Sequence, residues 1–275
     1  MTRRGFLLLI GTTAATGAHS PSPTLLSIPL DVGGDWGGSA PRDALAVVSR
    51  MRDASLQGLR LLSDRQPSAL RVDNHNSGPP FIWLHRDHPE RAQIVVDIGT
   101  RAWCQLAYQF GHELGHVLCN SWQLGNNPSP PSQWLEESMV EAFSLRGLGR
   151  LADSWRSDPP FPHNAAYASS ILEYRGNLLA GYRKAAELDF PAWLQAGRPP
   201  LKAGVSAPEG PAVAPIFDAL ERDSRCVEDM GAVNRWPERT SLPADQYIEA
   251  WRKSCAEIGT PGILPVQIKD LLRLG

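Results

Sequence analysis

The sequence feature that most constrains this chain is the run His112-Glu113-Leu114-Gly115-His116, which has the form His-Glu-x-x-His. On an α-helix, positions four apart lie on one face, so His112 and His116 would direct two imidazoles at one point. Convergent imidazoles are typical zinc ligands, and Glu113 would lie beside them without being a ligand. The motif therefore predicts a helix with two zinc ligands and a general base.

A catalytic zinc ion usually takes a third protein ligand, and the segment Trp134–Phe143 offers three carboxylates. Glu137 and Glu141 are four residues apart, so both can face the first helix. One carboxylate can bind zinc while the other accepts the second N–H of a ligand histidine. If Glu136 were the ligand, Val140 would stand where that second carboxylate is needed. We therefore expect Glu137 as the third ligand and Glu141 as the outer partner.

Together these two segments resemble the gluzincin metallopeptidases, in which His-Glu-x-x-His is followed about twenty residues later by Trp-Leu-x-Glu-x-x-x-Glu. The match covers about residues 93–148, with Glu136 and Ser138 where the family often has Asn and Gly. The resemblance implies a single Zn²⁺ cofactor, a peptide or protein substrate, and Glu113 as the base that activates water. The Gly-x-Met-Glu-Asn motif of related aminopeptidases is absent from the sequence, so that activity is not expected.

The family also stabilises the oxyanion with a Tyr or His from a later helix. Candidates here are His163, Tyr167, Tyr174 and Arg175. Tyr167 and Tyr174 are seven residues apart on one helical face, and ordinary packing is the alternative role for each. The family places a strand just before the metal helix, antiparallel to the bound peptide, and residues 93–98 fit that place.

Cys119, His85 and His88 are less favourable metal ligands than the three residues above. Cys119 and Trp122 occupy the positions where the metzincin motif needs Gly and His, which excludes that pattern. Cys119 lies on the same predicted helical face as the histidines, but a small buried side chain is the expected role for such a Cys. His85 and His88 lie in a polar turn, where solvated side chains are expected.

The N-terminus predicts export. Thr2–Leu7 resembles the twin-arginine export signal, and the apolar run 6–15 is too short to span a bilayer. Cleavage is expected after Ala18, which makes residues 1–18 a signal peptide, although an uncleaved anchor is the alternative. The protein is thus expected in the periplasm or secreted, with no stable membrane insertion beyond the signal.

Net charge and cysteine positions bear on the partners and on the disulfides expected of this chain. A net charge of −2 gives no reason to expect nucleic-acid binding. Cys104 and Cys119 would lie about 22 Å apart on one helix and cannot pair. In an exported protein, Cys226 and Cys255 are then the expected disulfide.

The predicted fold class is α+β: a small, mainly antiparallel or mixed sheet packed on the motif helix, followed by a mostly helical C-terminal lobe. Short extended runs alternate with turn residues before residue 100, and helical patterns follow. Strands are expected at 56–62, 69–72, 81–85 and 93–98, and helices at 39–51, 101–119, 132–148, 163–188, 215–222, 244–258 and 266–274. The expected divisions are a signal at 1–18, a linker at 19–38, a zincin-like catalytic core at 39–195 and a helical subdomain at 196–275.

The sequence therefore predicts an exported zinc metallopeptidase. One alternative is a zinc-stabilised binding or scaffold protein that does not catalyse a reaction. Another is an amidase acting on cell-wall peptides, which export would permit but no residue specifically indicates.

Overall fold

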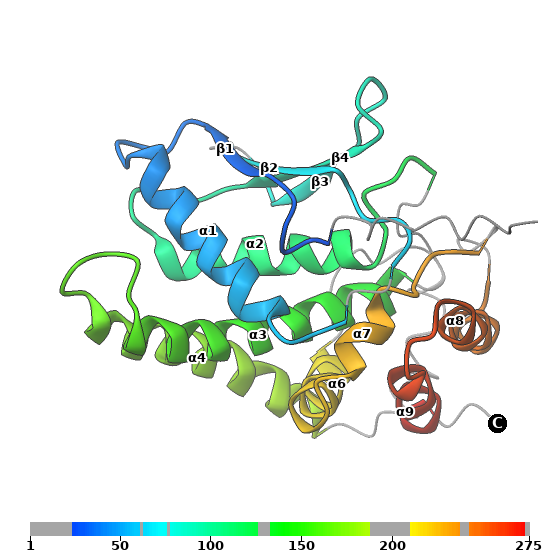
Figure 1. Cartoon of the computed structure of the whole chain (residues 1–275). Coiled ribbons are helices and arrows are strands. Elements are labelled where there is room, and N and C mark those ends of the chain that lie inside the picture. Colours follow the sequence, from blue (N-terminus) through cyan, green and yellow to red (C-terminus); the bar gives the residue numbers. More distant parts are fainter. Residues whose placement is uncertain are drawn as a thin grey trace, which may run out of the picture.

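The computed structural model places a small sheet over successive layers of helices, with a group of shorter helices toward the C-terminus (Figure 1). The α+β class is therefore confirmed, with a mixed sheet and mostly helical content. The structure describes residues 24–60, 63–75, 78–125, 133–187, 210–236 and 242–272.

The sheet has four strands in the order β1-β2-β4-β3. The pairs β1–β2 and β2–β4 are parallel, and β3–β4 is antiparallel. A parallel pair needs a crossover connection, which the first helix supplies between β1 and β2. The strands are β1 (Leu30–Gly34), β2 (Ala69–Asn74), β3 (Phe81–Trp83) and β4 (Arg91–Val96).

The helices form where the sequence loses its period-two pattern and gains an apolar stripe. The second and third helices pack side by side at the centre of the molecule, and the first crosses both. The helices are α1 (Pro41–Leu56), α2 (Trp103–Leu118), α3 (Gln133–Ser157), η1 (Ala165–Tyr167), α4 (Ala168–Ala186), α6 (Gly210–Arg222), α7 (Cys226–Met230), α8 (Ala244–Ile258) and α9 (Ile263–Leu271).

The two faces of the sheet differ because successive strand residues point to opposite sides. One face buries its aliphatic side chains against α1 and α2. The other face carries a polar row that crosses β1, β2 and β4 and ends at His85, two residues after β3. In this row Arg71 donates to Asp31 and Asp73, Gln93 donates to Asp73, and His85 lies within hydrogen-bond distance of Gln93.

The expected linker at 19–38 is wrong for the residues that the structure describes. Strand β1 lies within it and pairs with β2 through the backbone. Leu25, Ile28 and Trp36 are buried in the main core. The Pro and Gly content suggested a linker, but Gly34 is needed because its φ is +81° and its α-carbon lies against the backbone of Asn74.

The strand expected at 56–62 is also wrong for residues 56–60. Leu56 is the last residue of α1, and residues 57–60 continue as a turn and a loop. The apolar run was short enough to fit either element, and contact with the core extended the helix through it. Residues 61 and 62 lie outside the described residues.

One hydrophobic core extends from Leu25 to Leu272 across the described chain. Helix α6 packs against both α3 and α4, so the helices after residue 210 share this core. Buried Arg146 on α3 reinforces the junction by donating to the carbonyl oxygens of Ser55 and Leu220. The expected boundary between 195 and 196 lies outside the described residues.

The expected disulfide between Cys226 and Cys255 is wrong, because both residues are free thiols. Both side chains are buried in the C-terminal group of helices. Burial raises the pKa of each thiol to about 12, with the charge of nearby Asp229 acting in the same direction. They behave as small apolar core residues.

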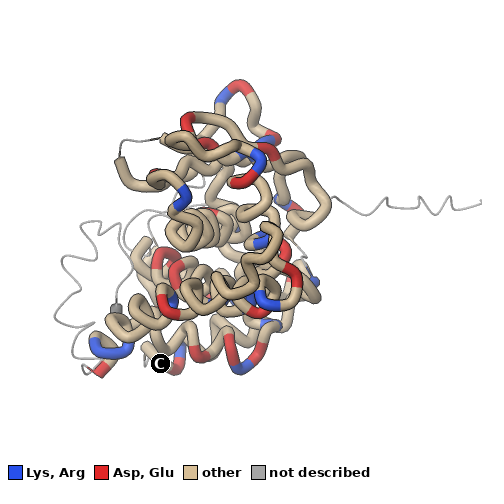
Figure 2. The backbone as a smooth tube through the Cα atoms, turned by 90° about the vertical axis from the view of Figure 1, so that its left-hand side faces the viewer, with Lys and Arg blue, Asp and Glu red and all other residues tan. Residues whose placement is uncertain are grey.

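The exterior carries mixed charge. Basic and acidic positions are interspersed along the backbone in the view of Figure 2. Within the described ranges, no helix combines the length and apolar character required to span a membrane. The expected signal peptide at 1–18 lies outside the described residues.

Candidate metal centre

The motif histidines lie on α2, which is buried along most of its length. Their four-residue spacing places both imidazoles on one face, with ring centroids 5.1 Å apart and a steep angle between the rings. The His112 side chain is 15% exposed and that of His116 is 7% exposed. The pair is therefore sheltered but not sealed from solvent.

Helix α3 brings the predicted third ligand to the same point. Glu137 Oε2 lies 3.2 Å from His112 Nε2 and 3.4 Å from His116 Nε2. One ligand atom from each of the three residues lies within 4.8 Å of the others, and this is the one such group found among the described residues. The sequence predicted this convergence of two helices that are separate in the chain.

The close approach of α2 and α3 depends on two glycines in the motif region. A Cβ atom on Gly111 would lie 2.5 Å from Met51 Cε and 2.9 Å from Ser144 Oγ. On Gly115 it would lie 2.8 Å from Val140 Cβ. Only a residue without a side chain fits at these contacts, and so the helices can bring their ligands together.

The second nitrogen of each imidazole binds a different carboxylate. His112 Nδ1 lies 3.0 Å from Glu141 Oε2, and His116 Nδ1 lies 2.8 Å from Glu136 Oε1. An ionised carboxylate can only accept, so each Nδ1 carries the proton and donates. The predicted role of Glu141 matches this geometry, whereas the role of Glu136 was missed. The sequence offered Glu136 only as an alternative zinc ligand to Glu137.

Electrostatics of the cluster is dominated by carboxylates. Burial disfavours protonation of His112, but its hydrogen bonds to Glu137 and Glu141 outweigh burial and raise its pKa to about 9. The same balance, with Glu136 and Glu137, raises the pKa of His116 well above its ordinary value. Burial alone would raise the pKa of Glu137, but its hydrogen bonds to the two imidazoles outweigh burial and lower that pKa. The site therefore favours positive charge at its centre.

These donors fit a zinc ion. With both Nδ1 atoms donating to carboxylates, the Nε2 lone pairs of His112 and His116 are aimed at the Glu137 carboxylate. Three electron-pair donors facing one point repel one another unless protons or a cation lie between them. Two imidazoles and one carboxylate, oriented by carboxylates behind them, form a donor set that suits catalytic zinc.

No family model, curated protein or solved structure matches this chain.

Glu113 lies beside the cluster without joining it. Its side chain is 3% exposed, and burial raises the pKa of its carboxyl group while the neighbouring imidazoles lower it less strongly. No described residue donates a hydrogen bond to this carboxylate in the structure. A buried carboxylate with a raised pKa and an open hydrogen-bond position is suited to accept a proton.

An aromatic group that the sequence did not indicate supports Glu141. Tyr108, one turn before His112 on α2, donates from its hydroxyl to both Glu141 oxygens at 2.9 Å. The Tyr182 hydroxyl also interacts with Glu141, whose charge adds to burial in raising the pKa of both tyrosines. The four-residue spacing between Tyr108 and His112 was the available signal.

The four candidates for oxyanion stabilisation lie in different surroundings, and only one of them packs next to the residues around the metal cluster. Tyr174 packs edge-on against Tyr108, with ring centroids 5.9 Å apart, so it is near the cluster. The Tyr167 hydroxyl instead lies 3.3 Å from Cys104 Sγ. Arg175 donates to the Leu145 carbonyl oxygen. His163 is an exposed loop residue with φ of +61°.

The remaining candidate ligands lie elsewhere. Cys119 is buried at the C-terminal end of α2 and is outside the three-residue group. His85 and His88 face each other across the turn after β3, with ring centroids 6.3 Å apart. His88 is exposed and His85 is occupied with Gln93.

Proposed function

We propose that this chain is a zinc-dependent metallopeptidase. The observation that carries the proposal is the convergence of His112 Nε2, His116 Nε2 and a Glu137 oxygen on one point, with Glu113 beside it. Each imidazole is oriented from behind by its own carboxylate, the arrangement that tunes catalytic metal sites. The gluzincin resemblance supports the same ligands and the same base.

Bound zinc supplies an activated water and an electrophilic contact for a carbonyl oxygen. The residues of the chain do the rest. Glu113 accepts the proton of the attacking water and passes it to the leaving amine. Glu136 and Glu141 hold the imidazoles in one tautomer. Tyr174 is the candidate best placed to donate to the developing oxyanion, because it packs on the aromatic group behind Glu141.

The strand that would pair with a peptide is β3. The sequence placed the substrate strand at 93–98, but β4 is bonded to β2 on one side and β3 on the other. Residues 93–95 have both edges paired and cannot accept a peptide strand, so that assignment is wrong for them. β3 is the edge of the sheet on that side and also contacts α2. Its exposed Phe81 and Trp83 side chains offer apolar contacts beside it.

The decisive experiment changes Glu113 to Gln. Zinc content should stay near one ion per chain, because Glu113 is not among the three ligands. Hydrolysis of a peptide library should fall by about 10²- to 10⁴-fold, the range for loss of a general base. The matched loss-of-metal variant is Glu137→Gln, which should lose zinc and hydrolysis together.

Unchanged hydrolysis in Glu113→Gln would sink the proposal. The alternative of a zinc-stabilised scaffold is favoured by the low exposure of the ligands, since a structural ion is usually enclosed. Wild-type protein that holds zinc and cleaves nothing in the library would support that alternative. Export through the twin-arginine route is part of the proposal and is tested by fusing residues 1–38 to a reporter that is active only outside the cytoplasm.

A further inference from the structure

The His116 side of the metal centre depends on a residue from the C-terminal part of the chain. Glu136, which accepts from His116 Nδ1, is 1% exposed. Its carboxylate also accepts from the Ser121 hydroxyl and from Asn234 Nδ2, the latter at 2.7 Å. A carboxylate buried to this degree needs several donors to stay charged and fixed. Asn234 is the one of these donors that lies far away in the sequence.

The side chain of Asn234 is fully used. Its Nδ2 group donates toward the Cys119 carbonyl oxygen at 3.0 Å and toward Glu136, with Ser121 Oγ at 3.0 Å. Its Oδ1 accepts from the Tyr247 hydroxyl at 3.0 Å. The carbonyl and carboxylate oxygens can only accept, so the amide group has one possible orientation. The nitrogen therefore points at Glu136.

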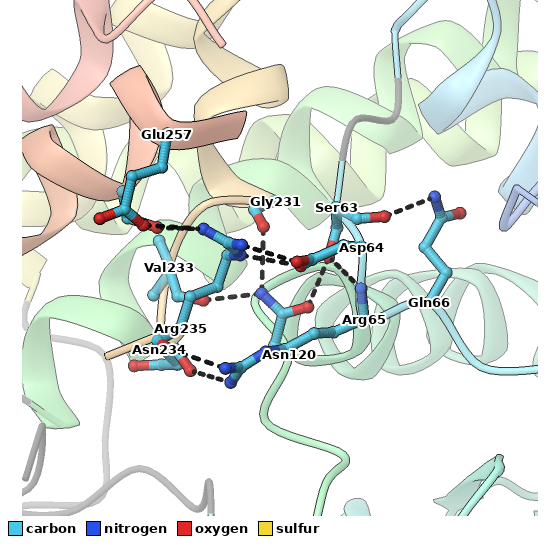
Figure 3. A network of polar contacts seen from close by, with 11 residues as sticks. Ser63, Asp64, Arg65, Gln66, Asn120, Gly231, Val233, Asn234, Arg235 and Glu257 are labelled. Atoms are coloured by element: carbon cyan, nitrogen blue, oxygen red, sulfur yellow. Dashed lines mark hydrogen bonds and ion pairs between the residues drawn. The ribbon is translucent and has the colours of Figure 1, made fainter. Parts of the chain in front are cut away.

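The backbone around Asn234 is held from both sides (Figure 3). Asn120 donates from its side-chain amide to the carbonyl oxygens of Gly231 and Val233. Arg65 donates to the carbonyl oxygens of Asn234 and Arg235. Asn234 itself has φ of +61°, a left-handed conformation that Asn tolerates better than most residues. The backbone of residues 231–235 is thus fixed by side-chain hydrogen bonds, which hold the Asn234 amide in place.

We infer that Asn234 is a positioning residue for the metal ligand His116, acting through Glu136. The chain runs from Asn234 Nδ2 to Glu136 Oε2, and from Glu136 Oε1 to His116 Nδ1. This inference rests on the proposed zinc site. It makes the segment after α7 a working part of that site, although Asn234 lies 98 residues from Glu136 in the sequence.

The test compares two substitutions of Asn234 in the full chain. Asn234→Asp keeps the size and tolerates the left-handed backbone, but places a second carboxylate against Glu136. Zinc affinity should fall by about 10-fold or more, at the lower end of the effect of outer partners on metal binding. Asn234→Gly also tolerates the left-handed backbone and removes the whole side chain, including the amide. The zinc affinity of this variant should also fall, by a smaller factor than that of Asn234→Asp.

A spectroscopic readout separates positioning from general stability. With Co²⁺ in place of zinc, both variants should shift the visible absorption bands, since these report the geometry at His116. The control is Asp229→Asn in the same region. It replaces with an NH2 group one of the two carboxylate oxygens that accept from the backbone N–H groups of Gly262 and Leu264. It should lower the melting temperature but leave metal affinity and the Co²⁺ spectrum unchanged.

Wild-type affinity and spectrum in both folded Asn234 variants would overturn the inference while leaving the metal site in place. An equal change of affinity in Asp229→Asn would also overturn it, because the effect would then be one of stability. Wild-type protein that binds neither zinc nor Co²⁺ would overturn the proposed function itself. Circular dichroism of each variant establishes that it is folded before the titrations are compared.

Discussion

Three neighbouring carboxylates on α3 have three different environments. Glu137 points at both Nε2 atoms, whereas Glu136 and Glu141 lie behind the imidazoles on the two opposite sides. Residues 136 and 137 differ by about 100° around a helix, so adjacent positions can reach opposite sides of one ring pair. Spacing alone predicted the contacts of Glu137 and Glu141 with His112. The environment of Glu136 is set by Ser121 and by Asn234, which is distant in the sequence.

At the residue scale we predict that Tyr174→Phe will reduce turnover while Tyr167→Phe will change it little. No described residue hydrogen-bonds to the Tyr174 hydroxyl, and the charge of Glu141 adds to burial in raising its pKa. The Tyr167 hydroxyl is already paired with Cys104. Loss of an oxyanion donor costs about 10²- to 10³-fold in turnover. Steady-state kinetics on one peptide substrate measures both variants.

Equal turnover in Tyr174→Phe and wild type would remove Tyr174 from the mechanism. Zinc content serves as the control for both variants, since neither tyrosine is among the three proposed ligands.

At the scale of elements, the contact between α2 and α3 makes the site. Neither helix carries the full ligand set, so the distance between their axes decides whether three donor atoms meet. That distance is short because Gly111 and Gly115 remove side chains from the contact. The motif positions that pack are therefore as important to the site as the positions that bind.

We predict that Gly115→Ala will destabilise the protein and weaken zinc binding. The new methyl group would lie 2.8 Å from Val140 Cβ, and a β-branched residue on a buried helix has little freedom to move. Overpacking of this kind costs about 1–3 kcal/mol of unfolding free energy. Chemical denaturation and a zinc titration measure the two effects.

The matched control is Gly176→Ala on α4, where a Cβ atom meets open space. This change should raise the unfolding free energy by roughly 0.5–1 kcal/mol, because Ala favours a helix interior over Gly. Zinc binding should not respond. A Gly115→Ala variant as stable as wild type would contradict this prediction, because α2 and α3 could then move apart without loss of unfolding free energy.

At the scale of the whole molecule, the parts on either side of the motif are tied together by polar contacts over long sequence distances. Arg235, after α7, forms a two-pronged ion pair with Asp64 in the loop between α1 and β2, at 2.7 and 2.8 Å. It also reaches Glu257 on α8 at 3.4 Å. These contacts belong to the polar network that also holds the backbone at Asn234 (Figure 3). The candidate site and the packing of the C-terminal segment therefore depend on the same contacts.

This ion pair predicts a pH dependence of stability. The hydrogen bond from Arg235 holds the pKa of Asp64 below its ordinary value in the folded protein. The stabilisation is therefore fully present above the unfolded pKa of about 4 and is lost as pH falls through the lower folded value. Because the Asp64 side chain is 58% exposed, solvent screening keeps the effect below about 1 kcal/mol.

Urea denaturation of Asp64→Asn and wild type at two pH values measures this effect. The variant should be less stable at pH 7, and the difference should shrink at pH 3. Arg235→Gln should show the same narrowing, since it removes the other partner. A difference that stays constant between the two pH values would contradict the assignment.

The sequence by itself determined the motif helix and the approach of Glu137 and Glu141 to its histidines, because helical periodicity converts spacing into direction. It also indicated the α+β class and the range of α8, where turn residues mark both ends. Only the tertiary structure decided that β1 belongs to the sheet, that β3 and not β4 is the edge, and that Cys226 and Cys255 stay reduced. It alone brought Asn234 to Glu136. Those features depend on contacts between segments distant in the chain, for which local pattern carries no signal.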